Sequence, residues 1–234
     1  MKIVLIGYGK MGKTLEEIAI NKGHDIVLIV NSINKNEIKA FDIIGADVAI
    51  EFTRPETAFD NVMMCMEANV PVVCGTTGWL DRMDEVEKYC KENNRSFFYS
   101  TNFSIGVNIF FEINILLAKL MNSQPQYDEV LIHESHHRSK LDSPSGTAIT
   151  LAGQAIGQIK RLKQWVNDKT DENVNVGKET YGELPIFSSR ENEVPGTHIV
   201  KYFSDVDEIE ITHKALNRDG FALGALSAAE WLLG

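Results

Sequence analysis

The densest group of reactive side chains lies at residues 134–148, which read Glu-Ser-His-His-Arg-Ser-Lys-Leu-Asp-Ser-Pro-Ser-Gly-Thr-Ala. Within it, His136, His137 and Lys140 place two imidazoles and an ammonium in a short stretch of chain. Such groups can transfer protons and attract a negatively charged substrate. Neighbouring side chains of a strand point to opposite faces, so His136 and His137 are expected to diverge if the strand continues through them.

The second half of this segment has the signals of a helix start. Pro144 suits the first turn of a helix predicted over residues 144–161, with Ser143 as a candidate N-cap. N–H groups at a helix N-terminus form a natural anion site. The residues expected to present such groups, together with hydroxyls, are Ser145, Gly146 and Thr147.

Three other interpretations of the segment remain open: a metal site, a solvated strand edge with ordinary histidines, and helix capping alone. A metal site would use His133, His136 and His137. On a strand, His133 and His137 would lie about 13 Å apart, which is poor for shared ligation unless the chain bends. We therefore expect no metal, and the density of the group favours a catalytic site.

A glycine-rich loop, Gly7-Tyr8-Gly9-Lys10-Met11-Gly12, joins a predicted strand (residues 2–6) to a predicted helix (residues 10–21). This is the context that the dinucleotide-binding fingerprint requires. The first glycine would form the turn, the second would admit a pyrophosphate, and the third would let helix and strand pack closely. A tight turn without a ligand is the alternative.

Other loops that follow predicted strands are expected to complete a nicotinamide nucleotide site. The strand at residues 25–30 ends at Asn31, where an acid would favour NAD and repel the 2′-phosphate of NADP. Asn31 does not repel it, so NADPH, NADH or both are expected. The remaining candidates could equally be ordinary turn residues; they are Gly75, Thr76, Thr77, Ser100, Thr101, Asn102 and Phe103.

Apolar runs and amphipathic stretches alternate over the first hundred residues, which predicts a Rossmann-like α/β unit with a parallel sheet. Further strands are expected at 47–52, 70–74 and 96–99, and helices at 55–68, with Thr53 as N-cap, and 80–91. Beyond residue 104 we expect a smaller α+β mixed-sheet domain. Its predicted parts are helices at 105–120 and 144–161, strands at 127–134, 184–190, 198–203 and 208–213, and a loop at 165–182.

The last predicted helix, residues 221–233, is apolar enough to return to the first domain. We therefore expect a dinucleotide-binding domain made of residues 1–105 and 216–234. Residues 106–215 would form a domain for substrate binding and oligomerisation.

Composition limits the classes of partner. The 234 residues include 33 acidic and 23 basic side chains, a net charge of −10 that disfavours nucleic-acid binding. The apolar runs fall short of the roughly 18–20 residues needed to span a bilayer, and the first run is too short for a signal peptide. We expect a soluble, cytoplasmic protein. Cys65, Cys74 and Cys90 lack metal-type spacing, which predicts reduced thiols.

Several motifs together resemble the dihydrodipicolinate reductase family. The segment from Glu134 to Ala148 is similar to that family's E-x-H-H-x-x-K-x-D-x-P-S-G-T-A signature. The likeness extends over the whole chain, although the chain is short for the family after the second strand and near residues 165–182. The other matching stretches are the glycine loop, Glu51–Glu56 (with Glu in place of the usual first Asp), Gly75–Gly78, Asn102–Asn108, Gly196–His198 and Ile211–Ala215.

The resemblance implies roles for individual residues. His136 would be the proton donor or acceptor and Lys140 the proton donor, while His137, Ser145, Gly146 and Thr147 would hold the substrate carboxylates. The glycine loop, Asn31 and the loops at 75–77 and 100–103 would contact NADPH or NADH. The implied reaction reduces a cyclic dicarboxylate of the diaminopimelate route to lysine, in a homotetramer built through the second domain.

Two other functions fit the first domain alone. A non-catalytic nucleotide-binding regulator would be expected to have lost the group around His136 and Lys140, which is intact here. An oxidoreductase of the glucose–fructose type would be expected to keep an acid after the second strand and to lack the Ser-Gly-Thr-Ala stretch. The intact group around His136 and Lys140 counts against the regulator, and Asn31 together with the Ser-Gly-Thr-Ala stretch counts against the other oxidoreductase.

Overall fold

The computed structural model describes residues 1–138, 140–168, 182–192 and 194–234. These residues form two compact units. Unit 1 comprises Met1–Ile105 and Arg218–Gly234, and unit 2 comprises Gly106–Asn217. The chain therefore returns to unit 1 after residue 217, where the sequence placed the return after residue 215.

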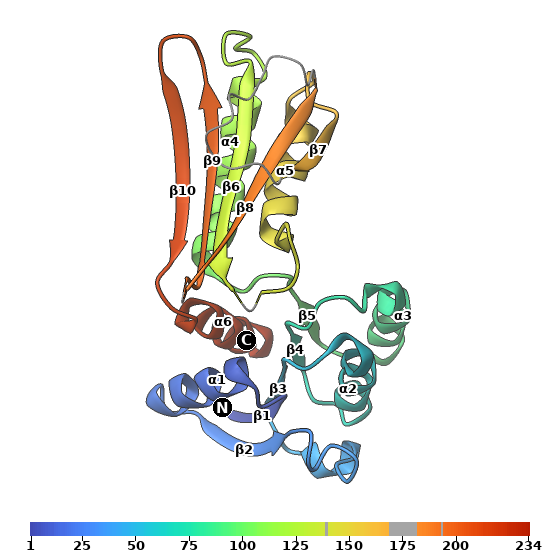
Figure 1. Cartoon of the computed structure of the whole chain (residues 1–234). Helices are drawn as coiled ribbons and strands as arrows, with labels where there is room; N and C mark the ends of the chain where they lie inside the picture. The colour runs from blue at the N-terminus through green and yellow to red at the C-terminus, as the bar shows by residue number, and fades with distance from the viewer. Residues whose placement is uncertain (139, 169–181, 193) are drawn as a thin grey trace. The chain divides into compact units, whose positions relative to one another are not determined.

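Unit 1 contains a parallel sheet of five strands in the order β2-β1-β3-β4-β5 (Figure 1). The strands are β1 (Lys2–Ile6), β2 (Asp25–Val30), β3 (Val48–Glu51), β4 (Val72–Cys74) and β5 (Phe97–Tyr99). The helices are α1 (Lys10–Asn21), α2 (Pro55–Glu67), α3 (Met83–Asn93) and α6 (Asp219–Leu233), with short 3₁₀ turns at Ala40–Ile43 and Leu80–Arg82. The predicted Rossmann-like unit is confirmed.

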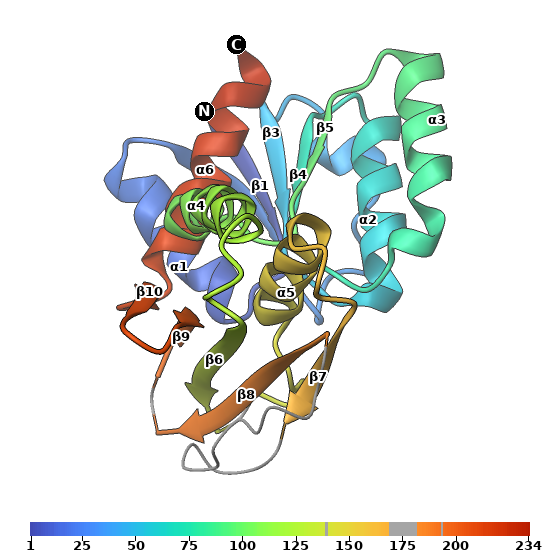
Figure 2. The same ribbon diagram turned by 90° about the horizontal axis from the view of Figure 1, so that it is seen from above.

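Helices cover both faces of this sheet. Figure 2 shows α1 and α6 on one side and α2 and α3 on the other. Alternate residues of β1 feed the two cores, since Ile3 and Leu5 pack with α1 and α6 whereas Val4 and Ile6 pack with α2 and α3. A strand buried on both faces must be apolar at nearly every position, which is why β1 was predictable from its apolar run. The edge strand β2 is partly exposed, but its apolar run gave the same signal.

The start of α2 differs from the expectation. Arg54, not Thr53, is the N-cap, and it makes no side-chain capping bond. The Thr53 hydroxyl instead donates to the carboxylate of Glu51, which is fully buried at the end of β3. A buried carboxylate requires hydrogen-bond donors. The Thr53 hydroxyl supplies one of them to Glu51 and therefore does not cap the helix.

Unit 2 contains a mixed sheet of five strands in the order β10-β9-β6-β8-β7 (Figure 1). The strands are β6 (Glu129–His137), β7 (Gln164–Asp168), β8 (Glu183–Glu191), β9 (Gly196–Phe203) and β10 (Glu208–Ala215). The central strand β6 is parallel to β8 and antiparallel to β9. Helices α4 (Ile105–Met121) and α5 (Gly146–Gln158) complete the unit, and the predicted second, mixed-sheet unit is confirmed.

Both helices of unit 2 pack on one face of its sheet. Phe110 of α4 and Leu151 of α5 share a core with Ile132, Val200 and Tyr202 from the strands. Between the helices, the buried Asn114 amide donates to the Leu151 carbonyl (3.1 Å) and to Gln154 Oε1 (2.9 Å). None of the helices in the described ranges combines the length and apolarity that crossing a membrane requires.

Two predictions for unit 2 were wrong. Helix α5 begins at Gly146 with Ser145 as its N-cap, so Pro144 precedes the helix and Ser143 does not cap it. Residues 164–168, partly expected as a loop, form the edge strand β7. The rest of the predicted loop, residues 169–181, lies outside the described residues.

Candidate active site

The loops predicted to contact the nucleotide lie at one edge of the sheet in unit 1. Backbone hydrogen bonds join them to neighbouring strand ends: Gly7 N–H donates to the Val30 carbonyl (2.8 Å) and Ser100 N–H to the Cys74 carbonyl (3.3 Å). Likewise, Gly75 N–H donates to the Glu51 carbonyl (2.9 Å). In open α/β sheets, ligands bind outside the carboxyl ends of the strands, so this edge is the candidate nucleotide site.

The glycine loop has the geometry that a phosphate cradle needs. Gly7 has φ +101°, and a Cβ on Gly12 would lie 2.2 Å from the Gly7 carbonyl oxygen, so the helix can start this close to the loop only with glycine there. At Gly9, the N-cap of α1, no side chain caps the helix, and its first turn holds no acid. The N–H groups of that turn are suited to an anion.

The side chains of this loop have different roles. Lys10 is exposed, whereas Met11 packs against the core between the sheet and α1. The Tyr8 hydroxyl donates to Glu16, an interaction within the loop and helix. Thus the backbone and Lys10, more than Tyr8 or Met11, are placed to meet a phosphate.

In the loop after β4, the two threonines differ. Thr76 is buried: its hydroxyl accepts from Thr53 N–H (2.7 Å) and its carbonyl accepts from Trp79 Nε1 (2.7 Å). Thr77 is exposed. Thr76 therefore fixes the loop, and Thr77 is the side chain available to a ligand.

The loop after β5 is held by its own side chains. The Ser100 hydroxyl donates to the Asn102 carbonyl (2.8 Å), and Phe103 is buried against the rings of Phe52 and Phe98. Thr101 is exposed. A role of Phe103 towards a nucleotide would therefore rest on its backbone.

Asn31 shapes the turn after β2. Its Oδ1 accepts from the N–H groups of Ile33 (2.8 Å) and Asn34 (3.3 Å), while Asn34 Oδ1 accepts from Asn31 N–H (2.8 Å). An aspartate at position 31 could accept the same two bonds and would add a negative charge to this turn. Asparagine and aspartate differ here only in whether an uncharged amide nitrogen or a charged carboxylate oxygen is present, and that difference decides whether position 31 repels a phosphate.

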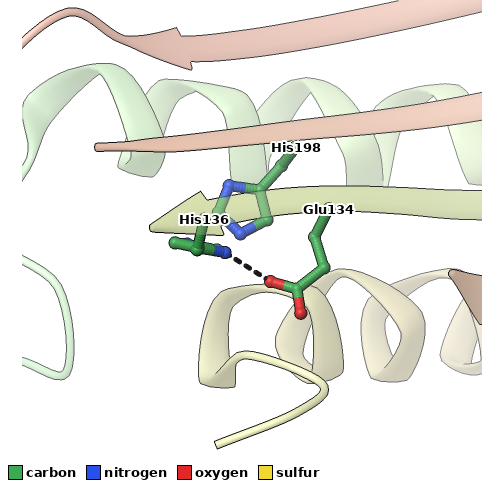
Figure 3. A group of neighbouring side chains, drawn as sticks. All are labelled: Glu134, His136 and His198. Carbon is green, nitrogen blue, oxygen red and sulfur yellow. Dashed lines mark ion pairs between the residues drawn. The ribbon is translucent and has the colours of Figure 1, made fainter. Parts of the chain in front are cut away.

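In unit 2, His136 forms an ion pair with a buried acid. Glu134 and His136 lie two positions apart on β6 and face the same side of the sheet, and Glu134 Oε2 lies 2.6 Å from His136 Nδ1 (Figure 3). The Glu134 side chain is fully buried and that of His136 is 10% exposed. As predicted for continuing strand, His137 points the other way and is half-buried.

Neighbouring strands supply two further groups. The register pairs Glu134 with His198 of β9 and His136 with Arg190 of β8. Arg190 Nη2 donates to Glu134 Oε1 (3.1 Å), and the imidazoles of His136 and His198 meet edge to face with centroids 5.0 Å apart. Strand register therefore brings Arg190 and His198 to Glu134 and His136, which are neighbours on β6.

The N-terminus of α5 closes the cluster. Ser145 N–H donates to Glu134 Oε1 (3.1 Å), and the Ser145 hydroxyl lies 3.0 Å from His198 Nε2 while accepting from Ala148 N–H (3.2 Å). Ser145 is buried, whereas Gly146 is exposed and Thr147 half-buried. The predicted anion-binding residues thus lie at a true helix start, one turn from the acid–base pair.

Charge in the cluster is set by burial and hydrogen bonding. Burial would raise the pKa of Glu134, but the hydrogen bonds from His136 and Ser145 outweigh it and hold that pKa well below its usual range. Burial, reinforced by the charge of His136, lowers the pKa of His198 to about 3. Near neutral pH, Glu134 is therefore ionised and His198 is neutral.

Lys140 lies in the loop between β6 and α5. Its side chain is 23% exposed and its Nζ forms an ion pair with Asp142 Oδ2 (2.8 Å). Burial opposes ionisation of Asp142, but this ion pair outweighs it and lowers the Asp142 pKa. The ammonium can exchange an exposed carboxylate of the protein for a carboxylate or developing charge of a ligand.

Three members of the cluster were not predicted as site residues. Glu134 could have been found, because it shares a strand face with His136 two residues away. Arg190 and His198 could not, because only the register of β8 and β9 brings them to β6.

A metal is a possible alternative occupant of this cluster. Ligand atoms of Glu134, His136 and His198 lie within 4.8 Å of one another. However, Glu134 already binds the Arg190 guanidinium and His136, so a metal would displace hydrogen bonds beside a fixed positive charge. The three histidines considered as metal ligands from the sequence, at positions 133, 136 and 137, do not come together, because His133 stacks on Phe187 on the face opposite His136.

Taken together, a Rossmann-like unit with a glycine loop and a separate unit with an acid–base group define an oxidoreductase of the nicotinamide-dependent class. Family comparison is more specific. Residues 1–103 match the family model described as dihydrodipicolinate reductase, N-terminus, and residues 106–234 match dihydrodipicolinate reductase, C-terminus. The chain belongs to the dihydrodipicolinate reductase family.

Individual relatives agree with this assignment. The chain is 49% identical to 4-hydroxy-tetrahydrodipicolinate reductase of Christiangramia forsetii, over 99% of this chain and 92% of that protein. It is 36% identical to the enzyme of that name from Archaeoglobus fulgidus, over 99% and 94%. A dipicolinate-bound dihydrodipicolinate reductase from Paenisporosarcina sp. TG-14 shares the fold, with TM-score 0.72 and 22% identity over 100% and 95% of the two chains.

Proposed function

We propose that the protein reduces 4-hydroxy-tetrahydrodipicolinate, through its dehydrated cyclic imine, to tetrahydrodipicolinate in the diaminopimelate route to lysine. The observation that carries the proposal is the acid–base group of unit 2, in which the family signature from Glu134 to Ala148 is complete and hydrogen-bonded. The names of the full-length relatives support the same substrate.

A bound nicotinamide supplies the hydride for this reaction. As the hydride adds to the conjugated ring, negative charge develops on the substrate and must be stabilised and protonated. In our proposal the Lys140 ammonium stabilises that charge and donates the proton, while His136 acts as the proton donor or acceptor. His137, Ser145, Gly146 and Thr147 hold the two carboxylates and so fix the ring for attack.

For the cofactor, we propose that the glycine loop, Asn31 and the loops after β4 and β5 bind NADPH at least as readily as NADH. The support is that Asn31 occupies the position where an acid would repel a 2′-phosphate. Lys10, exposed at the start of α1, adds an attractive charge near the phosphates.

The assembly proposed for the protein is a homotetramer formed through unit 2. Helices α4 and α5 occupy one face of the sheet of that unit. Leu131, Phe187 and Ile199 lie on the opposite face, because side chains alternate along β6, β8 and β9. Leu131 and Phe187 are buried, so in our proposal the partly exposed Ile199 supplies apolar surface for subunit contacts.

The central test is an assay with freshly prepared 4-hydroxy-tetrahydrodipicolinate and each cofactor separately. We expect oxidation of NADPH, and of NADH, only when the cyclic substrate is present. The absence of consumption with both cofactors would refute the proposed function.

A further inference from the structure

The carboxylate of Glu134 is held in one orientation. Two donors fix its Oε1, namely Ser145 N–H (3.1 Å) and Arg190 Nη2 (3.1 Å). The other oxygen, Oε2, is thereby directed at His136 Nδ1, 2.6 Å away (Figure 3). Because the side chain is fully buried, it has no solvated alternative to this arrangement.

This contact determines which nitrogen of His136 carries a proton. An ionised carboxylate has only acceptor atoms, so a lone pair on Nδ1 would repel Oε2 across this 2.6 Å contact, whereas a protonated Nδ1 is attracted to it. In a neutral imidazole, Nε2 then holds the lone pair, and in an imidazolium it holds the proton that can be transferred.

A glycine lies beside the remaining edge of the ring, where a side chain would press on Nε2. A Cβ on Gly196 would lie 3.0 Å from His136 Nε2, and Gly196 has φ +155°. The neutral ring of His198 packs edge to face beside His136 and adds no competing charge. Among the described residues, the ion pair of His136 is with Glu134, whose other oxygen binds Arg190, and Lys140 pairs with Asp142 in the loop that follows β6.

We propose that Glu134 is a positioning residue that fixes His136 with Nδ1 protonated, so that Nε2 is the atom that exchanges a proton with the substrate. The inference deepens the proposed function, because it assumes that His136 performs the proton transfer assigned there. It assigns no direct contact between Glu134 and substrate.

Glu134→Gln gives a sharp test, because an amide has only one oxygen. The two donors that hold Oε1 will select that oxygen, which turns the amide NH₂ towards His136 Nδ1. The amide then donates to Nδ1, and the imidazole must carry its proton on Nε2. The substitution should invert the tautomer while nearly preserving the shape of the side chain.

The first readout is the ¹⁵N NMR spectrum of histidine-labelled protein without substrate, with His136 assigned by comparison with His136→Gln. The spectra are recorded at about pH 8.5, above the ordinary range of histidine pKa values. We expect a protonated Nδ1 in the wild type and in Glu134→Asp, and an unprotonated Nδ1 in Glu134→Gln. An unprotonated Nδ1 in the wild type, or an unchanged one in Glu134→Gln, would overturn the proposal.

The second readout is kinetic. Glu134→Gln should lower kcat by about 10- to 100-fold, the usual effect of removing an orienting partner, with the KM for NADPH unchanged. Glu134→Asp, which keeps the carboxylate, should recover part of that loss. A Glu134→Gln enzyme with wild-type kcat would contradict the proposal, even if the tautomer is inverted.

Two controls separate positioning from simple loss of structure. Asn114→Ala removes buried hydrogen bonds between α4 and α5 away from His136, so it should lower the melting temperature but keep kcat within about twofold. Glu129→Gln, at the far end of β6, should change neither. If the wild type fails to reduce the cyclic substrate, the proposed function fails, while the NMR result still decides the role of Glu134.

Discussion

At the scale of single residues, local contacts in the cluster of unit 2 decide which side chains are charged and which are neutral. Glu134 stays ionised because donors surround it, and His198 stays neutral because it is buried beside other positive groups. Lys140 and His137 sit at the outer side of the same segment with greater exposure. In the proposed site, the residues that would contact the ligand and those that support them are thus distributed along one strand and the loop that follows it.

Substitutions of the assigned proton-transfer groups should act on turnover. His136→Ala and Lys140→Ala are each expected to lower kcat by about two orders of magnitude or more, the scale of acid–base catalysis. Thr147→Val removes the hydroxyl that we propose binds a substrate carboxylate, so it should mainly raise KM for the cyclic substrate. Steady-state kinetics with titration of NADPH binding would check this. Intact kcat in both alanine variants, or lost nucleotide binding, would contradict the assignment.

The neutral state of His198 has a consequence for stability against pH. Its pKa is about 3 in the folded protein and about 6.5 in an unfolded chain, so its stabilising contribution is complete above pH 6.5 and is lost as pH falls. In that window the loss approaches about 1.4 kcal/mol per pH unit. The difference in unfolding free energy between wild type and His198→Gln should therefore shrink from pH 7 to pH 5 in urea titrations. A constant difference would mean that His198 titrates alike in the folded and unfolded states.

At the scale of elements, the sequence was most informative where burial constrains every position. Strand β1 and helix α1 were predicted to the residue because a fully apolar run and a glycine loop bound them. Strand β7 was missed because Gln164-Trp165-Val166-Asn167-Asp168 lacks an apolar run, which an edge strand does not need. The start of α5 was misplaced because proline is common in the first turn of a helix, whereas Pro144 lies just before the N-cap Ser145.

The site was predictable only as far as it is local in sequence. The segment from His136 to Thr147 can be recognised in the sequence by its residue types and their spacing. The contributions of Arg190 and His198 depend on the alignment of β8 and β9 with β6, and a shift of one residue would turn both side chains to the other face. No local pattern specifies that register, so these residues appear only in the folded structure.

The turn after β2 makes a prediction about cofactor choice. Asn31→Asp keeps the acceptor for Ile33 and Asn34 N–H groups, so the turn should survive while gaining a charge that repels a 2′-phosphate. We expect the ratio of kcat/KM for NADPH to that for NADH to fall by about tenfold, equivalent to about 1.4 kcal/mol. Asn36→Asp, which adds the same charge elsewhere in the turn, is the matched control. A wild-type enzyme restricted to NADH, with no response to Asn31→Asp, would refute this interpretation.

At the scale of the molecule, each unit has its own core and its own candidate binding groups. The glycine loop belongs to unit 1, and the cluster around His136 belongs to unit 2. Substitutions in the cluster should therefore leave nucleotide affinity intact, which is why binding and turnover can be separated experimentally. The net charge of −10 would repel an anionic substrate, so the proposed site depends on a local cation such as Lys140.

The assembly prediction concerns the sheet face of unit 2 that α4 and α5 do not cover. Ile199 of β9 projects from this face, so Ile199→Glu would place charges in the proposed subunit contact, where burial of an unpaired carboxylate is costly. We expect a tetramer for the wild type and smaller species for Ile199→Glu by light scattering coupled to gel filtration. Ile20→Glu changes an exposed isoleucine of α1 in unit 1 and should leave the tetramer intact. A monomeric wild type, or a tetramer unaffected by Ile199→Glu, would show that this face does not join the subunits.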